Sequence, residues 1–412
     1  MTNTFDVVIA GGGVVGCAAA LAITNSTNLS VAVIESHPPE QSDIHPSFDA
    51  RVIALAHSSL QCLRDWQFDI SKIDGGDIKR IHVSDRKHIA QVVLDAAEIG
   101  VDALGKVVHL EQLGLALLSS IDKASVNNAS VKNTDASKNQ LKYFCPETIQ
   151  AVQKHQETIS LTTSERSLTC KLLVIAEGAQ SSTRTLAGMD VQTDDYEQTA
   201  IVTNVTTELA HNNCAYERFT QYGPLAFLPM HDSFNTQADG SKQRLMSVVW
   251  TTSHAHAARL SSVADEAFLA ELNSLFGSRL GKLEACTSRY QYPLMLRQAS
   301  NFVSHRSICI GNAAQSLHPI AGQGFNLGVR DIQALVKVLK GSQDAGDFST
   351  VQAYKAERVD DKAKVIGATD LLVRGFSNHY APFVIARNKA LFGLNMLSPL
   401  KNKFARFAMG QR

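Results

Sequence analysis

Three glycines near the N-terminus have the spacing of a nucleotide-binding turn. Gly11, Gly13 and Gly16 follow an apolar run and precede small residues at helical spacing. Glycines in this arrangement let the backbone turn tightly between a strand and a helix and approach a pyrophosphate at the positive helix N-terminus. The pattern predicts a bound dinucleotide, and its alternative is a glycine-rich turn without a ligand.

An acidic residue strengthens the first interpretation. Glu35 ends the next apolar run, about 20 residues beyond Gly16, where dinucleotide-binding folds carry a carboxylate for the adenosine ribose. A carboxylate there accepts hydrogen bonds from both ribose hydroxyls and repels a 2′-phosphate. The tightly bound nucleotide is therefore predicted to be NAD or FAD rather than NADP, and this pattern does not separate the first two.

The elements that position these residues follow from the apolar runs. Residues 5–10 and 29–34 read as buried strands around a helix that continues through Ile23. A later buried strand at 307–311 leads through a loop into a helix over about 324–339. Between them, turn residues separate short strands typical of an antiparallel sheet. These strands are expected at 200–209, 215–223, 225–230, 245–253 and 289–296, with one helix at 264–276.

Composition excludes several classes of protein. The 39 basic and 39 acidic side chains balance, so no long-range attraction to nucleic acid is expected. The seven cysteines are scattered and form no close pairs, which predicts no metal site and reduced thiols in a cytoplasmic protein. No stretch reaches the roughly 20 apolar residues of a membrane-spanning helix.

A second site far along the chain carries a resemblance. Residues 307–331 resemble the aromatic-ring flavoprotein monooxygenases, in which a strand ends in Gly-Asp, enters a His-Pro turn and continues into a helix through Gly-x-Gly-x-Asn. Two further segments, 49–55 and 172–184, resemble other motifs of that family. The likeness is closer to the hydroxylases of ubiquinone biosynthesis, through residues 217–230 and 404–410. Two departures stand out, because Asn312 and Glu177 each replace the usual Asp.

The resemblance implies roles for individual residues. Asn312 can bond a ribityl hydroxyl of FAD, since an amide both donates and accepts. Arg51 would reach the pyrophosphate or NAD(P)H, and His318 would lie near the flavin, fixing its loop or acting as a base. The implied cofactor residues are Gly11, Gly13, Gly16, Glu35, Arg51, Asn312, Pro319, Gly322, Gly324, Asn326 and Leu327; Glu177, Gly178 and Arg184 are associated with cofactor or NAD(P)H; Tyr222, Phe227, Pro229 and Tyr292 line the substrate.

The implied fold class is α/β, a doubly wound FAD-binding domain carrying an inserted, mostly antiparallel sheet domain for the substrate. The FAD-binding domain would comprise residues 1–73, 104–198 and 294–390, and the sheet domain residues 74–103 and 199–293. Residues 391–412 form a basic amphipathic tail. Such a tail can rest on a membrane surface or dock on the core with a solvated basic face.

The implied activity is hydroxylation of the aromatic ring of a polyprenyl methoxyphenol in ubiquinone biosynthesis. NADPH or NADH would reduce FAD, and molecular oxygen would supply the inserted atom. Other ubiquinone-biosynthesis enzymes and the inner face of the cell membrane are the expected partners of such a protein. Two alternatives stay open, a flavin-dependent prenyl reductase or dehydrogenase and a non-catalytic FAD-binding scaffold.

Overall fold

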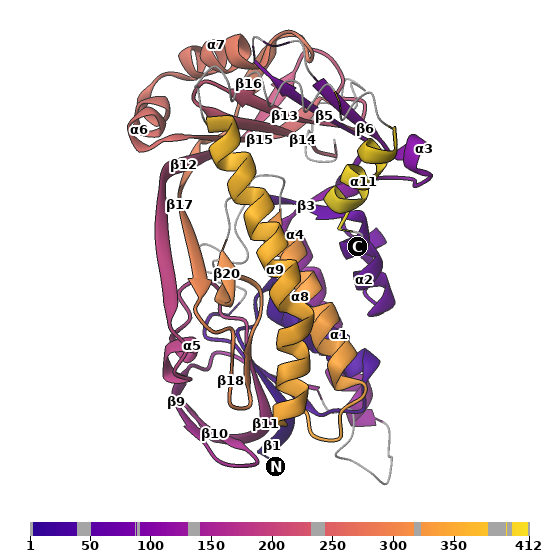
Figure 1. Cartoon of the computed structure of the whole chain (residues 1–412), viewed down its shortest axis with the longest axis vertical. Coiled ribbons are helices and arrows are strands. Elements are labelled where there is room, and N and C mark those ends of the chain that lie inside the picture. Colours follow the sequence, from indigo (N-terminus) through magenta and orange to yellow (C-terminus); the bar gives the residue numbers. More distant parts are fainter. Residues whose placement is uncertain are drawn as a thin grey trace.

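The chain forms two units that lie one above the other in Figure 1. The computed structural model describes residues 3–38, 51–86, 88, 91–130, 141–231, 244–316, 323–377, 393 and 398–410. The lower unit is built on a mainly parallel sheet, and the upper unit is built on a large, mostly antiparallel sheet. This is the predicted architecture of a doubly wound domain with an inserted sheet domain.

The parallel sheet begins at the predicted strand. β1 (Thr4–Ala10) is rich in β-branched residues and nearly all buried, as suits a strand covered on both faces. It pairs in parallel with β2 (Val31–Ile34) and β11 (Ser167–Ile175). The parallel order is β8-β2-β1-β11-β19, with β8 (Leu141–Phe144) and β19 (Ser307–Cys309) at its ends. Antiparallel additions are β9 (Ile149–Lys154), β10 (Ile159–Thr163) and β18 (Val303–Ser304).

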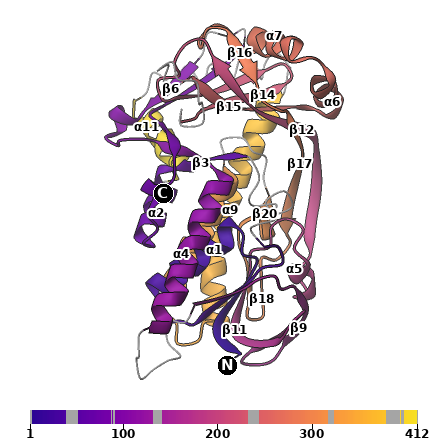
Figure 2. The same cartoon turned by 180° about the vertical axis from the view of Figure 1, so that it is seen from behind.

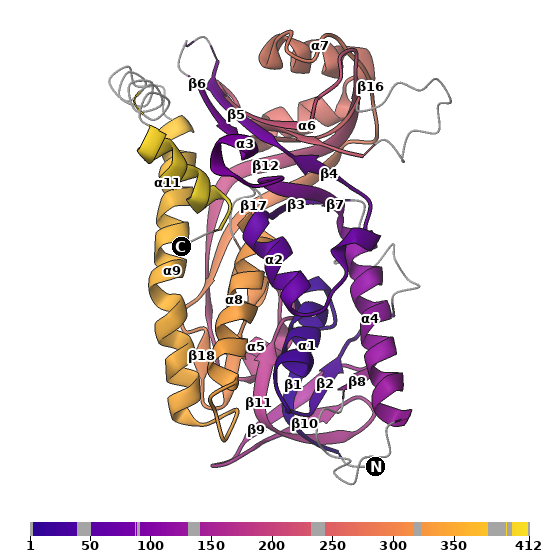
Figure 3. The ribbon, with the colours of Figure 1, turned by 90° about the vertical axis from the view of Figure 1, so that its right-hand side faces the viewer.

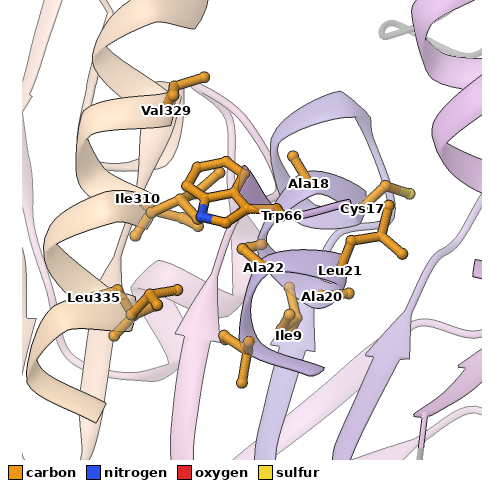
Figure 4. Close-up of a cluster of buried hydrophobic side chains, with 14 of the residues drawn as sticks. Ile9, Cys17, Ala18, Ala20, Leu21, Ala22, Trp66, Ile310, Val329 and Leu335 are labelled. Carbon is orange, nitrogen blue, oxygen red and sulfur yellow. The ribbon is translucent and has the colours of Figure 1, made fainter. Parts of the chain in front are cut away.

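Helices cover one face of this sheet. The predicted helix after the glycines is α1 (Val14–Ser26), and its alanines allow close packing against the sheet and α8 (Gln323–Leu339). Figure 4 shows Ala18 and Ala22 beside Trp66, with Ile310 and Val329 across the same cluster. The other helices of this unit are α2 (His57–Asp65), α4 (Leu110–Ser130) and α9 (Phe348–Ser377), while α5 (Ser182–Leu186) lies with β9 and β10 on the opposite face.

The upper sheet has nine strands, and the five strands expected from sequence are among them. Its order is β20-β17-β12-β15-β14-β13-β5-β6, with β16 paired to β12. The predicted boundaries at 199 and 293 fall inside β12 and β17, so continuous strands link the two units. The strands are β5 (Arg80–Asp85), β6 (Gln91–Asp95), β12 (Val191–Thr207), β13 (Cys214–Thr220), β14 (Gly223–Pro229), β15 (Leu245–Ser253), β16 (Leu283–Cys286), β17 (Tyr290–Ala299) and β20 (Gln315–Ser316).

The two faces of the upper sheet have different surroundings. Its outer face is covered by α6 (His254–Ser262) and by α7 (Asp265–Phe276), the helix expected from sequence. Side chains such as Phe227 and Trp250 fill the core between this face and the helices. Figure 2 shows the inner face turned toward the lower unit, where α9 reaches β14.

A small sheet and the C-terminal helix complete the inner side. The three-stranded sheet has the order β3-β7-β4 and consists of β3 (Val52–Ala56), β7 (Gly105–His109) and β4 (Gly75–Ile78). The helix α11 (Ser398–Ala408) packs beside it through Phe404 and Ala405, and Met409 directly after the helix joins the same core (Figure 3). Two short helices, η1 (Ile70–Lys72) and α3 (Ala96–Ile99), lie in the connecting segments.

The position of α11 bears on the predicted tail. Lys401 donates to Glu98 at 2.6 Å, and the apolar side of the helix is buried against the strands. This arrangement agrees with the docked-helix alternative, and contact with a membrane surface stays a prediction. Within the described ranges, no helix combines the length and apolar character that crossing a bilayer requires.

Candidate active site

Four predicted cofactor residues lie at one edge of the parallel sheet. Gly11 follows β1, Glu35 follows β2, Glu177 comes after β11, and Asn312 comes after β19. These strands are neighbours and run in parallel, so their carboxyl ends lie at the same edge. Ligands of doubly wound folds bind outside the carboxyl ends of the strands, and this edge is therefore the candidate cofactor site.

The glycine turn leaves no room for side chains. Gly11 has φ +100°, and a Cβ atom there would lie 2.8 Å from the backbone of Ala176. A Cβ atom on Gly16 would lie 1.8 Å from the carbonyl oxygen of Gly11. Gly13 caps α1, and Cys17 donates a hydrogen bond of 2.9 Å back to its carbonyl oxygen. The amides before Cys17 are left at the helix end, where a pyrophosphate can accept from them.

Glu35 is held beside the turn. Its Oε2 accepts a 2.6 Å hydrogen bond from the amide of Gly12, and its Oε1 accepts one of 2.8 Å from the amide of His37. The residue is buried, and Tyr143 of β8 lies against Gly12 as well. Burial raises the pKa of the Tyr143 phenol well above its ordinary value. The carboxylate is thus in the predicted place, and its contact with a ribose stays a prediction. Tyr143 was not identified from the sequence.

The distal motif meets the glycine turn. Gly311 has φ +57°, and a Cβ atom there would lie 3.1 Å from the side chain of Val15 in α1. A Cβ atom on Gly328 of α8 would lie 3.0 Å from the same valine side chain. Asn312, in the short helix η3 (Gly311–Ala313), has an exposed side chain. Two segments some three hundred residues apart in sequence therefore form one site around the start of α1.

A buried ion pair supports this junction and was missed at the sequence level. Asp331 of α8 accepts a 2.9 Å hydrogen bond from the amide of Gly311 through Oδ2. Its Oδ1 accepts from Nε of Arg358 in α9 at 2.7 Å, and both side chains are fully buried. Lys362 lies 3.6 Å from the same carboxylate, and burial lowers its pKa. The loop that carries Asn312 is thus anchored to two helices.

Glu177 and Arg184 also bind the protein itself. Glu177 accepts hydrogen bonds from the hydroxyls of Ser181 and Thr183, each at 2.6 Å. Arg184 is buried, and its Nη1 donates to the carbonyl oxygen of Ala313 at 3.0 Å. Both side chains hold the loops around the cofactor edge in place. Their predicted contact with NAD(P)H stays a prediction, with Gly178 at φ +82° between them.

The start of α8 is fixed in the same manner. Asn326 accepts from the amide of Ala56 at 2.9 Å and from the hydroxyl of Ser59 at 2.8 Å, and it donates to the carbonyl oxygen of Ala54 at 2.9 Å. Its side chain therefore joins α8 to β3 and α2. Leu327 is buried and Gly324 is exposed at the helix start. His318, Pro319 and Gly322 lie outside the described residues.

Residues predicted for the substrate side divide between the two faces of the upper sheet. Tyr292 of β17 pairs with Ala200 across the ladder, and the guanidinium of Arg51 lies 4.9 Å from the centre of its ring. This contact joins a predicted cofactor residue to a predicted substrate residue. Pro229 is buried at the end of β14, where its carbonyl oxygen approaches Gly76.

The structure does not bring Phe227 or Tyr222 to the inner face. Phe227 is fully buried on the helix-covered side, with its ring 4.1 Å from that of Phe276 in α7. Tyr222 stacks near His256 of α6, with ring centres 4.4 Å apart. Because side chains alternate along a strand, the neighbours of Phe227 in β14 face inward instead.

The residues at this edge fit FAD. Gly11, Gly12 and Gly16 have no room for a Cβ atom, α1 presents its N-terminus beside them, and Glu35 and Asn312 follow strands that end at the same edge of the sheet. Hence the glycine turn would hold the pyrophosphate, and the junction with Gly311 would receive the flavin half of the molecule.

Comparisons with known proteins agree with this assignment. Residues 146–369 match the FAD binding domain family. The chain is 32% identical to ubiquinone hydroxylase UbiL of Rhodospirillum rubrum, over 98% of this chain and 89% of that protein. It is 29% identical to 3-demethoxyubiquinol 3-hydroxylase of Escherichia coli, over 100% of both. Among solved structures, p-nitrophenol 4-monooxygenase PnpA from Pseudomonas putida matches at TM-score 0.70 and 16% identity over 100% of both chains, which supports the fold.

Proposed function

Because this chain belongs to the FAD-dependent monooxygenases that include the hydroxylases of ubiquinone biosynthesis, we propose that it hydroxylates the ring of a polyprenyl methoxyphenol. NADH or NADPH is the proposed electron donor and oxygen the second substrate. The observation that carries the proposal is the junction at Val15, which joins both halves of the cofactor site. The carboxyl ends of the strands at this site point toward the upper unit (Figure 1), whose inner sheet face would cover the ring of the substrate.

Different parts of the chain would bind the cofactor and orient the substrate. Bound FAD supplies the electron transfer and the chemistry with oxygen. The glycine turn and the start of α1 bind the pyrophosphate, Glu35 binds the ribose, and Asn312 faces the ribityl chain. The inner face of the upper sheet, with Tyr292 beside Arg51, excludes water and orients the phenol.

The proposed surroundings of the enzyme follow from its substrate. A polyprenyl chain partitions into the bilayer, so we propose that the protein works in the cytoplasm beside the inner face of the membrane. Contact with other enzymes of the same biosynthesis would pass the substrate on without release into water. Binding of purified FAD-loaded protein to lipid vesicles, measured by co-sedimentation, tests the membrane part of the proposal.

Product mass tests the reaction. FAD-loaded protein is incubated with NADH or NADPH and a polyprenyl methoxyphenol under oxygen gas enriched in the heavy isotope. Hydroxylation adds one labelled oxygen atom to the phenol, whereas a prenyl reductase adds two hydrogens. Oxidation of NAD(P)H that the phenol does not stimulate, with no product, would instead indicate a scaffold.

A further inference from the structure

Glu217 places a carboxyl group on the inner face of the upper sheet. Its two neighbours in β13 point to the outer face: the ring of Tyr216 lies 5.3 Å from that of Phe276, and Nε of Arg218 donates to the carbonyl oxygen of Leu275 at 2.8 Å. Side chains alternate along a strand. Glu217 therefore points to the opposite, inner face, which is turned toward the lower unit (Figure 2).

Glu217 is half-buried, and one oxygen of its carboxyl group has no hydrogen-bond donor among the described residues. Oε1 of Glu217 is shielded from solvent and accepts no hydrogen bond from the described residues. The residues directly across the two neighbouring strands are Val83 of β5 and Ala226 of β14. Asp85 is two residues beyond Val83 in β5 and therefore on the same face, and its carboxylate lies 4.0 Å from Nε2 of His88. Burial is the sole cause that raises the pKa of Glu217 to about 7.

The shielded Oε1 of Glu217 could accept a hydrogen bond from a bound ligand. Burial of a polar group without a hydrogen bond is costly, and native structures rarely leave one so. Across β14 and β15 the same face carries the small or apolar side chains of Ala226 and Val249, and Tyr292, whose ring contacts Arg51, lies on it four strands away from β13. An aromatic ring that lies on this surface and carries a hydroxyl group would satisfy both the apolar face and the carboxylate.

We propose that Glu217 accepts the hydrogen bond of the phenolic hydroxyl of the substrate and takes its proton as the ring is hydroxylated. This inference rests on the proposed function. The O–H bond breaks, the proton moves to a carboxylate oxygen, and the electron pair stays on the phenol oxygen. Its delocalisation into the ring makes the ortho and para carbons more nucleophilic, and the proton returns when the product forms.

The burial of Glu217 suits this role. A carboxylate in water is a poor base for a phenol, because the two pKa values lie far apart. Burial brings the pKa of Glu217 closer to that of a phenol, which makes proton transfer less unfavourable. At neutral pH a large share of the group is still ionised and able to accept.

Binding in the absence of NAD(P)H tests the contact without turnover. The absorbance of the flavin in the FAD-loaded protein reports binding of a simple methoxyphenol and of the matching dimethoxybenzene, which lacks the hydroxyl hydrogen. Between pH 5.5 and 8.5 we expect the affinity for the phenol to rise about tenfold and that for the ether to stay constant. A charge-assisted hydrogen bond has an effect of this order.

Glu217→Gln is the test variant, because it keeps the shape and removes the charge. It should bind the phenol about 10- to 100-fold more weakly at pH 8.5, with no dependence on pH. Glu284→Gln is the matched control, since Glu284 is an exposed carboxylate of the same sheet that pairs with Arg244 at 2.7 Å. This control should match the parent protein.

Equal affinity and equal pH dependence in Glu217→Gln and the parent would overturn the inference, even if the parent forms the oxygenated product. Conversely, a Glu217-dependent preference for the phenol supports the contact even if no oxygen is inserted, in which case the proposed function alone fails. If the variant does not retain FAD, the pH dependence of phenol and ether binding by the parent protein alone tests the inference. A preference of the parent for phenol over ether that does not change with pH also overturns the inference.

Discussion

A half-buried carboxyl group with one oxygen shielded from solvent and unpaired, as in Glu217, should destabilise the fold above neutral pH. Burial raises the pKa of Glu217 from 4.5 to about 7, so the folded protein keeps a proton that the unfolded chain releases between these values. The free energy of unfolding then falls as pH rises through this window and levels off above it. The full penalty is about 3 kcal/mol, of which about 2.5 kcal/mol develops between pH 5 and pH 8.

Thermal unfolding of the FAD-saturated protein measures this penalty. The difference in Tm between Glu217→Gln and the parent should grow in favour of the variant by about 3 °C from pH 5 to pH 8, given the unfolding entropy of a chain of this length. The Glu284→Gln control should show no such trend, because exposed ion pairs contribute little. A difference that is constant with pH would refute the reasoning, and one that favours the parent at pH 8 would reveal a stabilising partner of Glu217.

Three further outcomes are expected from the cofactor half of the site. Gly16→Ala should abolish FAD uptake, measured by flavin absorbance after reconstitution, whereas Gly341→Ala, whose Cβ meets nothing within 4 Å, should bind normally. Asp331→Asn leaves Arg358 with Asp361 as its remaining carboxylate and should lower the free energy of unfolding by about 1.5 to 3 kcal/mol in urea titrations; an unchanged midpoint would contradict the ion pair. Asn312→Asp should retain FAD and lower its midpoint potential, because the reduced flavin is anionic; an unshifted potential would place this residue away from the cofactor.

The local sequence was sufficient to predict the first half of the site. The run in β1, the glycines and the small residues of α1 each specify their own conformation, and all lie within one β-α-β unit. The shared edge that carries both Glu35 and Asn312 could also be expected, because parallel strands end at the same edge. The resemblance supplied the link to FAD that glycine spacing could not.

The division between ligand contacts and supporting contacts could not be predicted. Arg184 and Asn326 are polar residues in loop and helix motifs, and nothing in their types reveals that they bind carbonyl oxygens and amides of the protein. The ion pair of Asp331 with Arg358 joins two helices whose relative position depends on tertiary packing. Such pairs leave no local pattern in the sequence.

The direction of side chains in the upper sheet was the other gap. Both faces of β14 are covered, so its apolar run shows no alternation from which Phe227 could be assigned to the outer face. A signal was present in β13, where charged Glu217 occupies the same alternate positions as Ala215 and Phe219. The face to which Glu217 points can be assigned only once α7 is known to cover the side of the sheet that carries Tyr216.

The packing makes α8 the common reference for both halves of the active site. Asn326 at its start fixes β3, the strand that follows Arg51, while Gly328 packs on Val15 at the start of α1. One turn further on, Asp331 holds the amide before Asn312. A displacement of α8 would therefore move the glycine turn, the flavin loop and the arginine at the substrate face together. The position of a substrate ring relative to the flavin must stay within about 0.5 Å of the reactive geometry. A shared rigid element preserves this position better than three independent loops would.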